Sequence, residues 1–72
     1  VKIMGEVGLE TSILYKKGAG INYYLDNAGG LRETADTKRI TVVLANGKVF
    51  QYSRWKINPE IIAGSKIIVP RK

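Results

Sequence analysis

The sequence contains neither cysteine nor histidine. Without cysteine the chain has no disulfide, no thiolate metal ligand and no cysteine nucleophile. Without histidine it lacks the usual acid–base group of neutral pH and the commonest metal ligand. The serines and threonines therefore have no histidine to activate them, and the six carboxylates are dispersed along the chain. We expect a protein that is not an enzyme and that holds no metal and no cofactor.

Long hydrophobic runs are also absent. No apolar run approaches the ~20 residues that a transmembrane helix needs, and no signal peptide is recognisable in the sequence. Val1 lies inside a segment with the alternation of a strand. We therefore expect the chain to be a fragment of a larger protein, with no transmembrane segment of its own.

The composition is otherwise that of a small folded domain. The chain has 72 residues, of which 44% are hydrophobic and 25% charged, enough for one domain with a thin core. The net charge of +6 favours an anionic partner such as nucleic acid, a membrane surface or an acidic polymer. Because the basic residues are scattered, a solvated surface that keeps the domain soluble is the alternative explanation.

Hydrophobic periodicity predicts one helix among several strands. Residues 1–7 and 11–15 are typical of strands, and residues 66–69 predict a final strand. Between them, residues 21–28 have the spacing of one apolar helical face, and Gly29-Gly30 ends that helix because glycine adopts the left-handed conformation without a steric penalty. This order predicts an α+β fold, β-grasp-like, with a small mixed sheet packed on one short helix.

Residues 39–52 predict a β-hairpin. Asn46-Gly47 lies between two β-prone runs and is the strongest two-residue turn signal. A two-residue turn pairs Leu44 with Val49 and Val43 with Phe50. The face that packs on the helix then carries Ile40, Val42, Leu44 and Val49, and the opposite face carries Arg39, Thr41, Val43, Phe50, Tyr52 and Arg54.

This second hairpin face is the sharpest candidate for an interaction site. Its members combine aromatic rings with arginines: Arg39, Thr41, Phe50, Tyr52 and Arg54. Three interpretations remain open. The face contacts a neighbouring domain or subunit, it binds an acidic saccharide or single-stranded nucleic acid through stacking and arginine contacts, or it is ordinary surface.

A second candidate is the glycine-rich loop before the helix. Lys16, Lys17, Gly18 and Gly20 precede Ile21, and backbone amides at a helix start attract anions. The loop matches neither the Walker nor the Rossmann pattern. An anion loop and a flexible entry loop are both compatible with it.

Four ordered segments resemble the SLBB (soluble-ligand-binding β-grasp) domains of bacterial polysaccharide export proteins. They cover nearly the whole chain: Gly5-Glu6-Val7, the helix ending in Ala28-Gly29-Gly30, Ala35-Asp36 with the run 39–44, and the closing segment 62–70. Gly8-Leu9 stands where the family has Pro-Gly, and Ser65 stands where it has Asp.

The resemblance implies a cell-envelope protein on the periplasmic side of the bacterial outer membrane. It implies several such domains in one chain and a ring-like homo-oligomer that helps to form the conduit for capsule or exopolysaccharide. The implied role is a non-catalytic module that contacts polysaccharide, other domains of the chain or neighbouring subunits. A basic single-stranded nucleic-acid-binding domain is the weaker alternative, because no RNP, KH or helix-turn-helix signature is present. A generic protein-binding β-grasp adaptor is the third.

Overall fold

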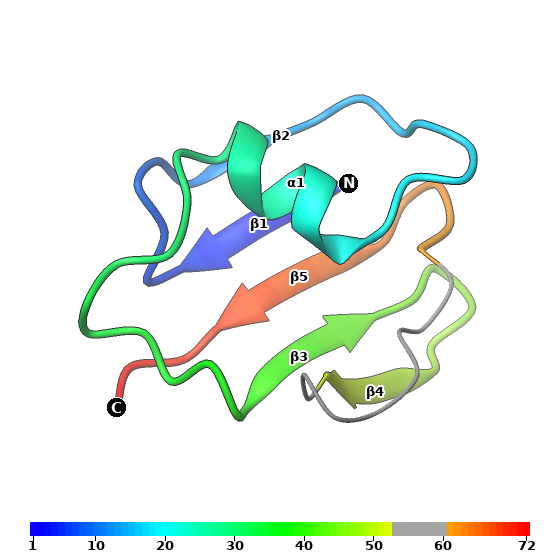
Figure 1. Ribbon diagram of the computed structural model, residues 1–72. Helices are drawn as coiled ribbons and strands as arrows, with labels where there is room; N and C mark the ends of the chain where they lie inside the picture. The colour runs from blue at the N-terminus through cyan, green and yellow to red at the C-terminus, as the bar shows by residue number, and fades with distance from the viewer. Residues whose placement is uncertain (53–60) are drawn as a thin grey trace.

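In the described part of the chain, five strands and one helix follow each other in the order that the sequence predicts (Figure 1). The computed structural model describes residues 1–52 and 61–72. The elements are β1 (Lys2–Gly5), β2 (Thr11–Ser12), α1 (Ile21–Asn27), β3 (Ile40–Val43), β4 (Val49–Tyr52) and β5 (Lys66–Val69). The strands at residues 1–7 and 11–15 are shorter than predicted, whereas β5 has the predicted bounds.

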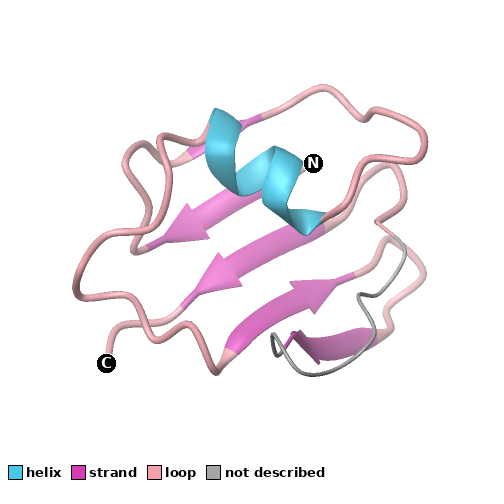
Figure 2. Ribbon diagram, in the orientation of Figure 1, coloured by secondary structure: helices cyan, strands magenta, loops and turns pink. Residues whose placement is uncertain are grey.

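The strands form one mixed sheet in the order β2-β1-β5-β3-β4. Strands β1 and β5 run parallel in the centre, and the other neighbours are antiparallel. Helix α1 lies across one face of this sheet (Figures 1 and 2). The α+β, β-grasp-like prediction is therefore confirmed.

The core lies between α1 and the sheet. The apolar helical face predicted from the sequence is buried, because the spacing of three and four residues places its members on one side of the helix. Alternate residues of the central strands face the helix and are buried against it. The buried set comprises Ile21, Tyr24, Leu25 and Ala28 from the helix and Ile3, Ile40, Val42, Ile67 and Val69 from the strands.

The helix ends where the two glycines predict. The amide of Gly29 donates to the carbonyl of Asp26, and the amide of Gly30 donates to the carbonyl of Leu25. With Gly29 at φ +85°, these two bonds form a Schellman motif, which satisfies the last carbonyls of the helix. The helix thus ends at Ala28-Gly29-Gly30.

The hairpin of β3 and β4 forms, but its predicted register was wrong by one residue. Val43 pairs with Val49 and Val42 with Phe50. The amide of Gly47 donates to the carbonyl of Leu44, and only Gly47 of the turn has a positive φ. The loop is therefore a three-residue connection with glycine in the left-handed position, not the two-residue turn, which needs positive φ at both central residues.

Within residues 1–52 and 61–72, no helix is long and apolar enough to cross a bilayer.

Candidate functional site

The observed register places residues of the predicted hairpin face on opposite sides of the sheet. Residues paired across neighbouring strands have side chains on the same side of the sheet. Phe50 therefore shares a side with buried Val42, whereas Thr41 lies on the opposite side. The prediction that Phe50 joins Thr41 on one face was wrong, because one extra residue in the turn moves every β4 side chain to the other face.

Of the remaining members of that predicted face, Arg39 is engaged in the turn before β3. The Nε atom of Arg39 lies 3.7 Å from the Oδ2 atom of Asp36, and the side chain of Arg39 is 75% exposed. Asp36 also accepts a hydrogen bond from the amide of Lys38, so it closes the turn before β3. Tyr52 pairs with Ile40 through its backbone. The side chain of Tyr52 and all of Arg54 lie outside the described part of the chain.

The glycine-rich loop is tied to the helix by a tyrosine. The amide of Lys16 donates to the hydroxyl of Tyr24 at 3.0 Å, and that hydroxyl lies 3.3 Å from the carbonyl of Lys16. The ammonium of Lys16 lies 5.0 Å from the centre of the Tyr23 ring, a cation–π contact. Tyr23 is half-buried beneath this lysine.

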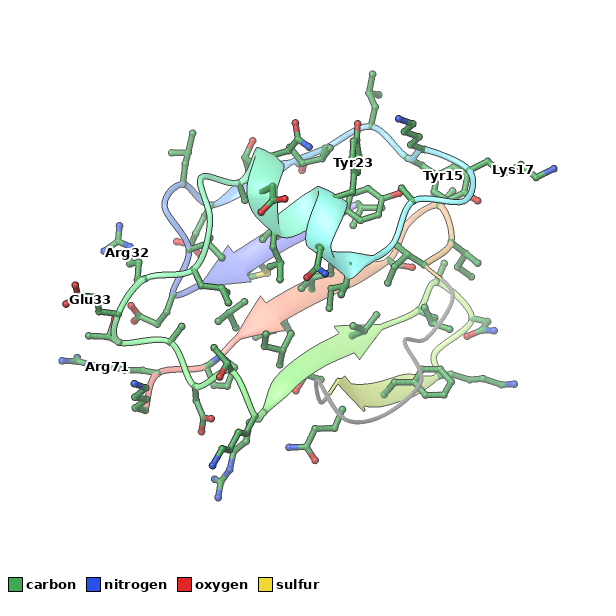
Figure 3. All side chains as sticks on the ribbon, viewed as in Figure 1. Tyr15, Lys17, Tyr23, Arg32, Glu33 and Arg71 are labelled. Carbon is green, nitrogen blue, oxygen red and sulfur yellow. The ribbon has the colours of Figure 1, made fainter. Side chains whose placement is uncertain are left out.

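The other loop residues leave no comparable contact. Lys17 points away from the protein (Figure 3), and Gly18 and Gly20 are exposed. The observed contacts give this loop a structural role at the start of α1, and anion binding by Lys16, Lys17, Gly18 and Gly20 stays a prediction.

The end of the helix, which carries part of the family resemblance, contacts the turn that follows Gly5-Glu6-Val7. The turn after β1 lies against the end of α1, where the amide of Gly8 donates to the carbonyl of Gly30 and the amide of Leu9 to the carbonyl of Ala28. A Cβ atom on Gly29 would lie 3.1 Å from the Cα atom of Gly8. Only glycine allows the two backbones to approach this closely. Ala28-Gly29-Gly30 therefore holds the end of the helix against the turn after β1.

The closing segment also has a structural role. Buried Ser65, which stands where the family has Asp, donates from its Oγ atom to the carbonyl of Ile62 at 2.6 Å and accepts from the Ile62 amide at 3.3 Å. This turn leads directly into β5. The hydroxyl of Ser65 thus forms the side-chain hydrogen bonds of this turn, and no carboxylate is needed there.

The described residues also line a shallow groove of about 490 Å³ beside the turn after β1. One atom of each charged side chain in the groove is hydrogen-bonded within the chain. The Nε atom of Arg32 donates to the carbonyl of Val7, Glu6 accepts from Thr34, and Glu10 accepts from the amide of Gly5. No group of three acidic side chains in the described chain is arranged to hold a metal ion.

A further candidate surface is the side of the sheet opposite α1, which we call the open face. Strand alternation places on it the residues between those that face the helix. No helix or strand of the described chain lies over it, since α1 is on the other side and every strand is in the sheet. Its members are Lys2, Met4, Ser12, Thr41, Val43, Val49, Gln51, Lys66 and Ile68.

The register arranges the open face in two rows across the strands. One row runs from Ser12 through Lys2 and Lys66 to Val43 and Val49. The other runs from Met4 through Ile68 and Thr41 to Gln51. Apolar side chains therefore adjoin the lysines on two sides.

The apolar members of the open face are accessible to a partner. Val49 is 62% exposed, and Met4, Val43 and Ile68 are half-buried. Sequence reasoning missed this surface, because the strand order that joins β1, β5, β3 and β4 is not encoded in any local pattern. The signal that was present is that β1, β3, β4 and β5 each place one apolar and one polar residue on the open face, as Ile68 and Lys66 do in β5.

No protein family, curated protein or solved structure that we compared with the chain matches it. The likeness to SLBB domains therefore depends on the quoted residues alone.

Proposed function

We propose that this chain is a non-catalytic binding and assembly module of a bacterial polysaccharide export protein, and that it makes its contacts through the open face. The observation that carries the proposal is the one-sided cover of the sheet. Helix α1 buries one side, and the other side presents Met4, Val43, Val49 and Ile68 with no described helix or strand over it. Contiguous accessible apolar surface of this kind is typical of interaction sites.

The export context comes from the ordered segments that resemble SLBB domains. Contacts between these segments support the proposal. Gly5 pairs with Val69 across β1 and β5, and Gly8 lies against Gly29. The segments are thus parts of one fold, as they are in the family. On this proposal the protein acts on the periplasmic side of the outer membrane, where it joins neighbouring domains or subunits around exported capsule or exopolysaccharide.

A cellular experiment with two matched variants tests this function. Val49→Glu places a charge on the open face, and Leu9→Glu places one on the turn after β1. The two residues are similarly exposed, at 62% and 68%. We expect Val49→Glu to reduce surface polysaccharide by about tenfold, because a buried unpaired charge at a contact disfavours assembly by at least ~1.4 kcal/mol.

The measurement is surface carbohydrate per cell, with protein level followed by immunoblot. Leu9→Glu should leave export at the wild-type level. Export that is unchanged in Val49→Glu cells, or in cells that lack the gene, would overturn the proposed function.

A further inference from the structure

Among its nine residues, the open face carries two positive charges and no negative charge. Lys2 and Lys66 are direct neighbours on the parallel strands β1 and β5, and both are exposed. None of the nine open-face residues is acidic. Neither lysine forms an ion pair with any carboxylate in the described residues, where the one ion pair joins Arg39 and Asp36.

This arrangement is unfavourable for the isolated domain. Neighbouring strands lie roughly 4.8 Å apart, so the two lysine side chains leave the sheet at adjacent positions. Like charges at directly opposed positions destabilise a sheet. A carboxylate placed between them would turn this repulsion into two charge-assisted contacts.

We propose that the open face binds a segment of another protein that carries apolar side chains together with a carboxylate. The carboxylate lies between Lys2 and Lys66, and the apolar side chains lie against Met4, Ile68 and Val43. This inference rests on the proposed function in one respect, that the open face is the contact surface. It adds the chemical class of the partner.

A second copy of the same face is not the occupant. A two-fold interface brings identical patches together. Two open faces would set four lysines against each other without a carboxylate from either side, because no open-face residue is acidic. Such like-charge contact costs affinity.

A purely anionic polymer fits less well than a protein segment. A polymer held only by charge needs cations along its length. Here two lysines stand beside four apolar residues, Met4, Val43, Val49 and Ile68. A surface on which apolar and charged side chains adjoin has the mixed composition of a protein interface.

Three synthetic peptides of twelve residues test the partner chemistry. They share the same leucine and valine positions and carry Glu, Gln or Lys at the remaining central position. Each is titrated into the ¹⁵N-labelled chain while amide chemical shifts are recorded. We expect the Glu peptide to shift the amides of Lys2, Met4, Val43, Lys66 and Ile68. The Gln peptide should bind the same surface about tenfold more weakly, and the Lys peptide should not bind.

Lysine variants locate the contact. In Lys2→Gln/Lys66→Gln the affinity for the Glu peptide should fall to that of the Gln peptide. The control Lys17→Gln removes an exposed lysine that points away from the protein (Figure 3) and should leave the affinity unchanged. Raising the salt from low to high concentration should weaken the Glu peptide selectively.

Several results would overturn the inference. These are equal binding of the Glu and Gln peptides, shifts on another surface, no binding at all, or the same open-face shifts at similar affinity with oligogalacturonate or single-stranded DNA. Loss of export in Val49→Glu cells together with any of these results would leave the proposed function standing and reject only the partner chemistry. Intact export in those cells would reject the proposed function itself.

Discussion

The two sides of the sheet differ sharply although they are built from the same strands. Ile67 and Ile68 are consecutive residues of β5, yet Ile67 is fully buried against the helix side and Ile68 is half-buried on the open face. The covered face consists of large apolar side chains in mutual contact. The open face mixes apolar residues with a lysine pair.

This difference separates what holds the fold together from what is available for recognition. Close packing makes the covered face intolerant of small volume changes. The open face has no described partner element, so its residues are constrained by strand pairing and not by packing. A fold of this size has little stability to spare, about 4–11 kcal/mol for 72 residues. Substitutions on the two faces can therefore be compared by the change that each causes in the free energy of unfolding.

The largest expected effect comes from shortening one isoleucine on each face. Ile67→Ala should lower the free energy of unfolding by ~2–5 kcal/mol, because it opens a cavity beneath α1. Ile68→Ala should lower it by only about 1 kcal/mol, since a half-exposed side chain loses less burial. Urea unfolding followed by circular dichroism measures both. Equal losses would mean that the two faces are packed alike and would break the comparison.

An intermediate effect is expected where the helix is seated on the covered side. Gly29→Ala and Gly30→Ala both place alanine at positive φ, +85° and +81°. Only at Gly29 does the new Cβ atom also meet backbone, that of Gly8 at 3.1 Å, whereas Gly30 faces open space. We expect a loss of about 1 kcal/mol for Gly30→Ala and about 2 kcal/mol for Gly29→Ala.

Thermal unfolding of the two glycine variants provides the measurement. The difference between them isolates the close approach of the two backbones. If both variants lost the same stability, the junction would depend on backbone conformation alone.

The smallest expected effect is a gain on the open face. Lys66→Gln removes one of two neighbouring like charges and should raise the free energy of unfolding by about 0.3–0.5 kcal/mol at low salt. The gain should vanish at high salt, because exposed charges are screened. In a Lys2→Gln background the same substitution should have no effect, and a gain that persists there would contradict the repulsion between the two lysines.

Local patterns were sufficient to predict the elements. The helical spacing of Ile21, Tyr24, Leu25 and Ala28, the end of the helix at Gly29 and the final strand were all predicted and are observed. These features depend on residues close together in the chain. The hairpin was predicted correctly in existence and incorrectly in register, because the type of turn depends on the conformation of Asn46 as well as on its identity.

The candidate site was less accessible to sequence reasoning. The predicted grouping of Arg39 and Thr41 with Phe50 failed with the hairpin register. The open face joins β1, β5 and β3, whose residues are separated by long stretches of chain. No local pattern states that Lys2 and Lys66 become neighbours.

Composition and periodicity by themselves determined the class of this protein: a small α+β domain without cysteine or histidine, with one amphipathic helix and an alternating pattern in its strands. Such properties follow from the residues and their nearest neighbours in the chain. Only the tertiary structure decided which strands lie side by side, which face of the sheet the helix covers and which charges therefore meet. Strand order and register depend on contacts between distant segments, and a shift of one residue exchanges the two faces of a strand.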